Sequence, residues 1–533
     1  MRMRTSSLTG TSALLKLALR RDRIMIPAWM YGISALVLST AYGFKKLFPT
    51  TAERLQFASG IAGKATFKAL YGPAFDLSTT GGLTAWRITS AAATFAGLMG
   101  LLLAVRHTRA EEEAGRAELL GATVVGRHAG LAAALLVVVI ANLALAALVT
   151  LGLAALGLPL QGSVAMALGL ASAGCVFGAV AAVCAQVATT ARGAGGAAGA
   201  LLGLAFILRA AGDNGDGTLS WLSPIGWAQR VRPFAAERWE VFALPLLLTA
   251  VLVPVAVALA NRRDLGAGML AQRAGRPAAS RWLRSPWGLA WRLQRGSLLG
   301  WTVGFAVAGV IFGSVAKDVA NLGDQIAKVL QRLGGGISTA TLVDSYLAAV
   351  MAFLAITATG YVIQAVLRIR AEETALRGEE VLATAVSRWR WAGAHLVCAA
   401  LGTVVIMAAF GATAGLTYGL RIGDVSGQVP RVTEAALVQV PAAWVLGGMA
   451  IAAVGLLPRL VALAWAAFGV CFGLEWIGGV LDLPHTVLDL SPFHHAPQYP
   501  LASVTATPLL LLLAAAAALT LIGLAGLRRR DIL

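Results

Sequence analysis

Charged residues are scarce in this sequence. Asp, Glu, Lys and Arg together make up 13% of the 533 residues, whereas hydrophobic residues make up 58%. In soluble globular domains about a quarter of the residues are charged. The composition therefore excludes an ordinary soluble protein and predicts an all-α integral membrane protein.

Sequence motifs of hydrolases and of structural metal sites are also absent. The chain contains no HExxH, CxxC or GxSxG pattern. One segment, SGIAGKAT, resembles a phosphate-binding loop, but Ala58 stands where the first glycine is required and Ala65 follows Lys64 directly. We therefore expect no catalytic residue, no metal site and no cofactor in this chain.

Cysteine is rare, and its positions do not indicate a disulfide framework. All four cysteines fall within apolar runs, where a thiol usually behaves as a small apolar group; they are Cys175, Cys184, Cys398 and Cys471. Three histidines near the C-terminus, His485, His494 and His495, could bind a metal or sense pH. We favour the simpler interpretation that they are loop histidines at a membrane interface.

About twelve apolar runs are long enough to cross a bilayer, which takes about 20 helical residues. The first six lie near residues 24–43, 88–105, 129–157, 164–190, 194–211 and 241–260. The other six lie near residues 298–316, 346–367, 393–420, 433–457, 460–480 and 508–527. Six crossings return the chain to its starting side, so two six-helix halves are expected to form a parallel repeat.

The formal charge of +18 does not indicate a nucleic-acid partner, because the basic residues are divided unequally between the two sides of the membrane. With the N-terminus inside, the inside segments contain 28 of the 43 Lys and Arg residues but 11 of the 25 Asp and Glu residues. This is the positive-inside distribution. It predicts that both termini are cytoplasmic, and we expect the first apolar run to remain in the membrane as an anchor.

A charged island between two apolar runs, at residues 106–127, occurs twice in the chain. Nine of its residues recur 261 positions later. The first copy contains Arg109, Glu111, Glu112, Arg116, Glu118, Ala122, Thr123, Val125 and Arg127. The second contains Arg370, Glu372, Glu373, Arg377, Glu379, Ala383, Thr384, Val386 and Arg388. The repeat unit is therefore about half of the chain.

Each island is predicted to form one short helix. Glu112 and Arg116 are spaced i,i+4, as are Glu373 and Arg377, which places opposite charges on one helical face. A charged helix between two spans is either a solvated turn or a docking surface. Because the helix occupies the same place in both halves, we favour docking through the five Arg and Glu residues of each copy.

Further repeated segments mark the ends of the halves. Residues 8–20, LTGTSALLKLALR, are expected to form an interfacial helix on the cytoplasmic face, and 285–295, SPWGLAWRLQR, are its counterpart. Basic stops end both halves, at 262–264 and 529–531. We expect a first six-helix half at residues 1–264, a cytoplasmic linker at 265–284 and a second six-helix half at 285–533.

Polar side chains inside the predicted spans are few. They could line a substrate path or merely bond neighbouring helices; the four are Asn142, Gln186, Gln364 and Gln439. The best ionisable residue for coupling to an ion gradient, Glu475, lies near the outer end of its run. The energy source for any transport is therefore expected to lie outside this chain.

The order of these elements resembles the permease subunits of type-2 ABC exporters. It comprises an interfacial helix, a first span, a long outer loop, a second span, the Arg/Glu helix, a third span and an LSP-containing hairpin before the sixth span. That tripeptide occurs at 222–224 and again at 490–492. The fused form with two six-span halves is similar to actinobacterial exporters described as polyketide-antibiotic or multidrug transporters.

This resemblance implies that helices at 109–122 and 370–383 dock into clefts of two separate ATPase subunits, which bind the ATP and Mg²⁺. ATP binding would then shift the halves between inward-facing and outward-facing states and export an amphiphilic compound across a bacterial plasma membrane. Leu119 and Leu120 correspond to Glu380 and Val381 in the second copy, so the equivalence of the two docking sites stays open.

Other classes of protein stay open as alternatives. A secondary, ion-coupled carrier of the major-facilitator type also has twelve spans in a parallel repeat. The loop between spans two and three of that family resembles GxxxDRxGRR, whereas the loop here is rich in Glu. A lipid exporter and a membrane scaffold without transport are the remaining alternatives.

Overall fold

The computed structural model describes residues 6–60, 62–264, 266, 268–269, 278–332, 339–477 and 484–530. The regular secondary structure in these ranges is entirely helical. The chain divides into two compact units, Met1–Gly275 and Arg276–Leu533. This division falls inside the predicted linker 265–284, of which residues 265, 267 and 270–277 lie outside the described ranges.

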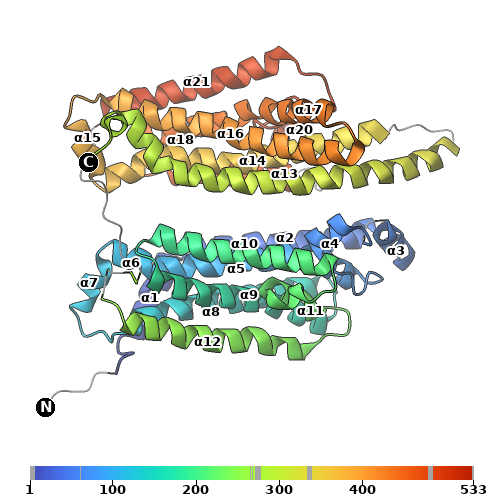
Figure 1. Cartoon of the computed structure of the whole chain (residues 1–533), viewed down its shortest axis with the longest axis horizontal. Coiled ribbons are helices and arrows are strands. Elements are labelled where there is room, and N and C mark those ends of the chain that lie inside the picture. The colour runs from blue at the N-terminus through green and yellow to red at the C-terminus, as the bar shows by residue number, and fades with distance from the viewer. Residues whose placement is uncertain are drawn as a thin grey trace. The chain divides into compact units, whose positions relative to one another are not determined.

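Over its described residues, the first unit contains six long helices and several short ones, arranged as in Figure 1. The long helices are α2 (Met25–Leu47), α5 (Thr80–His107), α8 (Ala129–Ala155), α9 (Leu160–Val187), α10 (Ala191–Asn214) and α12 (Ala243–Asn261). The short helices are α1 (Thr11–Arg21), α3 (Thr51–Ser59), α4 (Ala65–Tyr71), α6 (Arg109–Glu113), α7 (Arg116–Gly121), η1 (Leu219–Leu222), α11 (Pro224–Arg230) and η2 (Trp239–Phe242). Helices α6 and α7 lie at one end of the unit, and α3 and α4 lie at the other.

The second unit has a similar order of elements. Its long helices are α13 (Pro286–Arg332), α14 (Thr339–Thr374), α16 (Arg388–Ile422), α17 (Val425–Val438), α18 (Val440–Leu456), α19 (Ala462–Ile477) and α21 (Ala506–Arg529). Its short helices are η3 (Arg281–Arg284), α15 (Arg377–Leu382) and α20 (His485–Leu488). Helix α15 occupies the sequence position in this unit that α7 occupies in the first.

Eleven helical segments among the described residues are long and apolar enough to cross a membrane. The run expected at 460–480 is represented by the shorter apolar segment Ala462–Glu475, and part of that run lies outside the described ranges. The run expected at 433–457 belongs to one candidate span, Val425–Leu456, that comprises both α17 and α18. The predicted all-α, multi-span membrane protein is therefore confirmed.

The helix expected at residues 8–20 is present as α1, but the prediction of a separate short helix at 285–295 is wrong. These residues form the first turns of the 47-residue helix α13. The first unit has a break at Asp22, whose carboxylate bonds to Arg106 and His107, whereas the second unit has Gln294 in a continuous helix. Arg, Leu and Gln all favour helix, so nothing interrupts it. Ser285 does cap this helix, since it accepts a hydrogen bond from Gly288 N at 3.1 Å.

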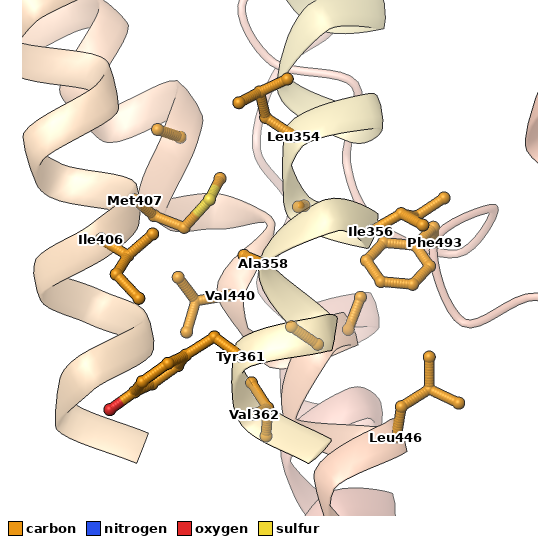
Figure 2. Close-up of a cluster of buried hydrophobic side chains, with 14 of the residues drawn as sticks. Leu354, Ile356, Ala358, Tyr361, Val362, Ile406, Met407, Val440, Leu446 and Phe493 are labelled. Carbon is orange, nitrogen blue, oxygen red and sulfur yellow. The ribbon is translucent and has the colours of Figure 1, made fainter. Parts of the chain in front are cut away.

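The second long helix of each unit is among its most buried. In both α5 and α14, 72% of the most apolar stretch is buried within its unit. In the second unit, Leu354, Tyr361 and Val362 of α14 pack against side chains of α16 and α18 (Figure 2). The Tyr361 hydroxyl donates a hydrogen bond to Cys398 O at 3.2 Å, and any Cβ at Gly402 would overlap it. Each charged island therefore follows directly from a helix that is fixed in a core.

Candidate docking and coupling site

The first charged island forms two short helices. Helix α5 ends at His107, α6 spans Arg109–Glu113, and Gly115 interrupts the path with a φ of 71° before α7 begins. A left-handed residue commonly ends a helix, and glycine adopts this conformation without a steric penalty. The prediction of a single helix over this island is therefore wrong.

The second island is interrupted at the equivalent position. Helix α14 continues to Thr374, and α15 begins at Arg377. Between them Leu376 has a φ of 59°, 261 residues after Gly115. A side chain in this backbone conformation costs roughly 1–2 kcal/mol. The break is thus kept in the second copy despite an unfavourable residue.

The break changes which charges pair. Arg116 Nε lies 2.7 Å from Glu111 Oε2, and Arg377 Nε lies 2.8 Å from Glu372 Oε2. These partners are five residues apart, so the predicted i,i+4 pairs from Glu112 to Arg116 and from Glu373 to Arg377 do not form. Each carboxylate raises the pKa of the arginine that it contacts. The pairs hold the start of α7 and of α15 against the preceding helix.

A glutamate that pairs with two arginines lies beside each break, and we call these ion pairs the glutamate clamp. In the first unit, Glu112 contacts Arg109 at 2.6 Å and Arg263 at 2.5 Å. In the second unit, Glu373 contacts Arg370 at 3.0 Å and Arg530 at 2.6 Å. The side chain of Glu112 is 12% exposed and that of Glu373 is fully buried. Each clamp joins the island to the end of the last long helix of its unit.

The sequence prediction missed the basic stops as members of these sites. Arg263 and Arg530 recur at an offset of 267, so they fall out of register with the islands at 261. The repeated position after each last span was the available signal. Arg127 and Arg388 support the same junction, because they donate to backbone oxygens at the end of α12 and of α21: Asn261 O at 3.0 Å and Arg530 O at 2.7 Å.

The predicted docking residues differ in accessibility. Arg109, Glu372 and Glu373 are buried, and their charges face partners within the chain. Glu118 and Glu379 are exposed, and no ion pair of either is found among the described residues. Only part of each predicted set is therefore available to a partner, and the rest shapes the island from inside.

The two units also anchor their islands differently. In the first unit, Arg21 of α1 pairs with Glu111, and Arg109 donates to Thr189 O at 2.7 Å in the turn before α10. In the second unit, the residue that corresponds to Glu111 is Glu372, and its further partner comes from the same helix, α14: Arg368 contacts it at 2.7 Å. The first island is therefore held by more elements of its unit.

A cavity of about 1070 Å³ lies beside the first island. Leu14 and Leu17 of α1, Leu119 and Leu120 of α7 and Leu131 of α8 contribute to its apolar lining. Charged lining groups come from the ion pairs of Glu111 and Glu112 and from the end of α12. The island thus borders an amphipathic hollow within the first unit.

The four polar residues predicted for a substrate path are not gathered by the structure within either unit. Asn142 is fully buried and donates to Val138 O of its own helix at 2.9 Å. Gln186 accepts from Arg263 at 2.8 Å and belongs to the island's surroundings. Gln364 accepts from Trp301 at 3.0 Å, and Gln439 donates to Pro497 O at 3.0 Å. Their assignment to a substrate path stays a prediction.

The three histidines form a loose group near α20. His494 lies 3.6 Å from Asp489 Oδ1, and a His495 ring nitrogen lies 2.8 Å from Asp489 O. The rings of His485 and His494 are 6.2 Å apart between centroids. Across the described ranges, no cluster of three His, Cys, Asp or Glu residues has the arrangement of a metal site.

The residues at the two breaks allow a matched test of backbone strain. Leu376→Gly should stabilise the protein by about 0.5–1 kcal/mol, because it removes the left-handed strain but adds freedom to the unfolded chain. Gly115→Leu should destabilise it. The thermal midpoint of the purified full-length chain measures both. Leu376→Ala, which removes the exposed side chain but keeps a Cβ, is the control, and equal midpoints for the Gly and Ala variants would contradict the strain argument.

The helices and the site together define a multi-span membrane protein built from two units, each with an ion-paired charged island after its second long helix. A sequence model of the family described as "Multidrug efflux system permease Rv1217c, C-terminal domain" matches residues 283–528. The chain is also 42% identical over 534 residues to the Multidrug efflux system permease protein Rv1217c of Mycobacterium tuberculosis (strain ATCC 25618 / H37Rv), an alignment that covers 99% of this chain and 96% of that protein.

The chain therefore belongs to the family of multidrug efflux system permeases. The expectation of an exporter permease from the order of the elements is confirmed. The family's name describes a transporter component and not an enzyme, which agrees with the expectation that this chain is a permease.

Proposed function

We propose that this chain is the membrane-spanning permease of an ATP-driven ABC exporter and that two separate ATPase subunits dock on its charged islands. The observation that carries this proposal is the repeated site: in each unit, a well-buried helix leads into a broken, ion-paired island that the glutamate clamp joins to the last long helix. A solvated turn would have no need for a carboxylate that is largely shielded from water and paired with two arginines at the equivalent position of each unit.

The clamp gives a physical route for coupling. A force on α7 or α15 reaches α5 or α14 along the chain and reaches α12 or α21 through the ion pairs of Glu112 or Glu373. ATP and Mg²⁺ would be bound by the partner subunits. Nucleotide must favour one conformation of the complex over the other, because docking with equal affinity for both would shift nothing.

The proposed cargo is an amphiphilic or hydrophobic, drug-like compound that moves outward by alternating access. Both termini and both islands would face the cytoplasm of a bacterium, as the positive-inside distribution predicts. The relative from Mycobacterium tuberculosis is named as a multidrug efflux permease, which supports this class of cargo.

Docking can be tested by charge reversal at the exposed glutamates. Glu118→Arg combined with Glu379→Arg should weaken the binding of ABC ATPase subunits by about tenfold or more, since a long cationic side chain replaces an exposed carboxylate at each docking site. The measurement is co-purification and affinity with each soluble ABC ATPase from the same genome. Glu112 and Glu373 are unsuitable for reversal, because a cation there would face two arginines and disturb the fold.

Glu53→Arg combined with Glu240→Arg is the control for charge alone. Glu53 also accepts a hydrogen bond from Thr50 N, and Glu240 pairs with Arg238, so the thermal midpoint is measured alongside binding. The control changes the same number of charges, at α3 and η2, and α3 lies at the other end of the first unit from α6 and α7 (Figure 1). This control should bind the ATPases as the original chain does. Absence of any bound ATPase, together with efflux driven by an ion gradient alone in vesicles, would instead identify a secondary carrier. ATP-dependent movement of lipid but not of drugs would identify a lipid exporter.

A further inference from the structure

The exposed faces of α7 and α15 differ in chemistry although both islands carry the glutamate clamp. We call Glu118, Leu119 and Val124 the first docking surface, and Leu376, Glu379 and Glu380 the second docking surface. Leu119 is 74% exposed and Val124 is 75% exposed. At the offset of 261, Glu380 and Ala385 replace these two apolar side chains. The glutamate clamp is therefore present in both units, but the two docking surfaces beside it differ.

The charges on the two surfaces differ as well. The first surface has one exposed carboxylate, Glu118, whereas the second has two adjacent ones, Glu379 and Glu380. Among the described residues, none of the three has an ion-pair partner. The exposed leucine of the second surface, Leu376, is 61% exposed and precedes α15 at the position of Gly115. Apolar and acidic groups thus occupy different places on the two surfaces.

The first surface is also next to an open apolar hollow. Leu119 and Leu120 line the cavity of about 1070 Å³, together with Leu14 and Leu17 of α1. A partner's apolar side chain that contacts Leu119 could continue into this hollow and lose further water-accessible area. Burial of apolar surface contributes roughly 25 cal/mol per Å², and this contribution does not come from exposed charges that salt screens.

We infer that the two docking surfaces bind their ATPase subunits by different forces, apolar burial at the first surface and attraction to a basic patch of the ATPase at the second. This inference rests on the proposed function. Salt screens exposed charges, with a Debye length that falls from about 14 Å to about 4 Å between 50 and 500 mM. The second surface therefore loses its ATPase first as salt rises, and the complex passes through a state with one bound subunit.

The test is the stoichiometry of the full-length permease in detergent with the purified ATPase identified by co-purification. Mass photometry at rising KCl should show two bound subunits at about 50 mM and one at about 500 mM. Affinity at the second surface should fall about tenfold over this range, and affinity at the first should fall less than about twofold.

Exchange of the differing residues identifies which surface is which. Glu380→Leu with Ala385→Val gives the second surface the two apolar side chains of the first, and both subunits should then stay bound at high salt. Leu119→Glu with Val124→Ala does the opposite, and both subunits should leave together. All four side chains are exposed, so the thermal midpoints should stay within about 1 °C of that of the original chain, in keeping with surface substitutions.

The outcomes separate this inference from the proposed function. If no ATPase binds at any salt concentration, the proposed function fails. If two subunits bind but leave together over one salt range, and neither exchange alters that range, ATPase docking stands and the inequivalence of the two surfaces is overturned.

Discussion

Glu373→Gln is expected to cause the largest loss of stability among single substitutions at the islands. The side chain of Glu373 is fully buried and lies 2.6 Å from Arg530 and 3.0 Å from Arg370. Removal of one member of a buried ion pair leaves an uncompensated charge and typically costs about 3–5 kcal/mol. Here two arginines lose their common counter-charge, although both retain some contact with water. We expect a loss of about 3 kcal/mol, measured as a lower thermal midpoint of the full-length chain.

The matched control is Glu379→Gln, six residues further on. Glu379 is exposed and has no ion pair among the described residues, so its substitution should change stability by less than about 0.5 kcal/mol. A double-mutant cycle with Arg530→Gln then isolates the contact between α14 and the end of α21. Contacting residues typically show coupling energies of about 0.5–3 kcal/mol. Additive effects of Glu373→Gln and Arg530→Gln would show that the clamp does not join the two helices.

The variant Arg530→Gln can also separate an effect of the clamp on ATPase docking from an effect on the coupling of ATP hydrolysis to transport. Among the described residues, no hydrogen bond or ion pair joins Arg530 to Leu376, Glu379 or Glu380, so Arg530→Gln should leave ATPase affinity within about twofold of its original value. If the clamp transmits movement, transport should nevertheless fall relative to ATP hydrolysis in that variant. Equal loss of ATPase binding and of transport would instead indicate that the clamp only shapes the docking surface.

Much of the architecture could be predicted from the sequence, because membrane spans and repeated segments have simple sequence patterns. Apolar runs placed the long helices, and the offset of 261 located both islands, since burial in lipid and duplication leave strong signals in single residues. We expected an interfacial helix separate from the first span of the second unit, but one helix continues through Gln294. Helix propensity alone does not distinguish a continuous helix from two helices with a short turn.

The details of the island were less predictable because they depend on one backbone conformation. Gly115 offered a signal for a helix end, but its counterpart Leu376 did not, and the break moved the partner of each arginine by one residue. The clamp arginines Arg263 and Arg530 are more than 150 residues from their glutamates. Sequence spacing cannot show such a contact, since only the packing of the last long helix against the island creates it.

Another buried carboxylate, that of Asp213, lies near the C-terminal end of α10. The turn that contacts the first island precedes the N-terminal end of the same helix. Asp213 has a side chain that is 2% exposed, and it lies 3.4 Å from Arg209 and 4.0 Å from Arg230. Ser220 of η1 donates a hydrogen bond to the same carboxylate at 2.6 Å. Arg230 also contacts the ring of Trp221 at 4.8 Å. One aspartate thereby joins α10 to the segment that leads through η1 and α11.

Asp213→Asn should therefore destabilise the first unit strongly. The substitution leaves Arg209, which is fully buried, and Arg230 without their shared counter-charge, and a loss of about 3–5 kcal/mol is expected. Asp216→Asn is the control, three residues further on in the turn after α10, because Asp216 is exposed and, among the described residues, its carboxylate accepts hydrogen bonds from Thr218 alone. The thermal midpoint should fall for the first variant and stay nearly constant for the second.

A double substitution at Asp213 and Arg209 separates the contribution of the ion pair from that of side-chain burial. A buried ion pair is often no more stabilising than an apolar side chain of similar size, so Asp213→Leu with Arg209→Met should recover part of the stability lost by Asp213→Asn. Arg230, which is partly exposed, would then retain access to water and to Gly217 O at 2.9 Å. If the double substitution lowers stability as much as Asp213→Asn does, the loss comes from broken hydrogen bonds to Ser220 and its neighbours. The balance of charge among Asp213, Arg209 and Arg230 is then not what stabilises this end of the unit.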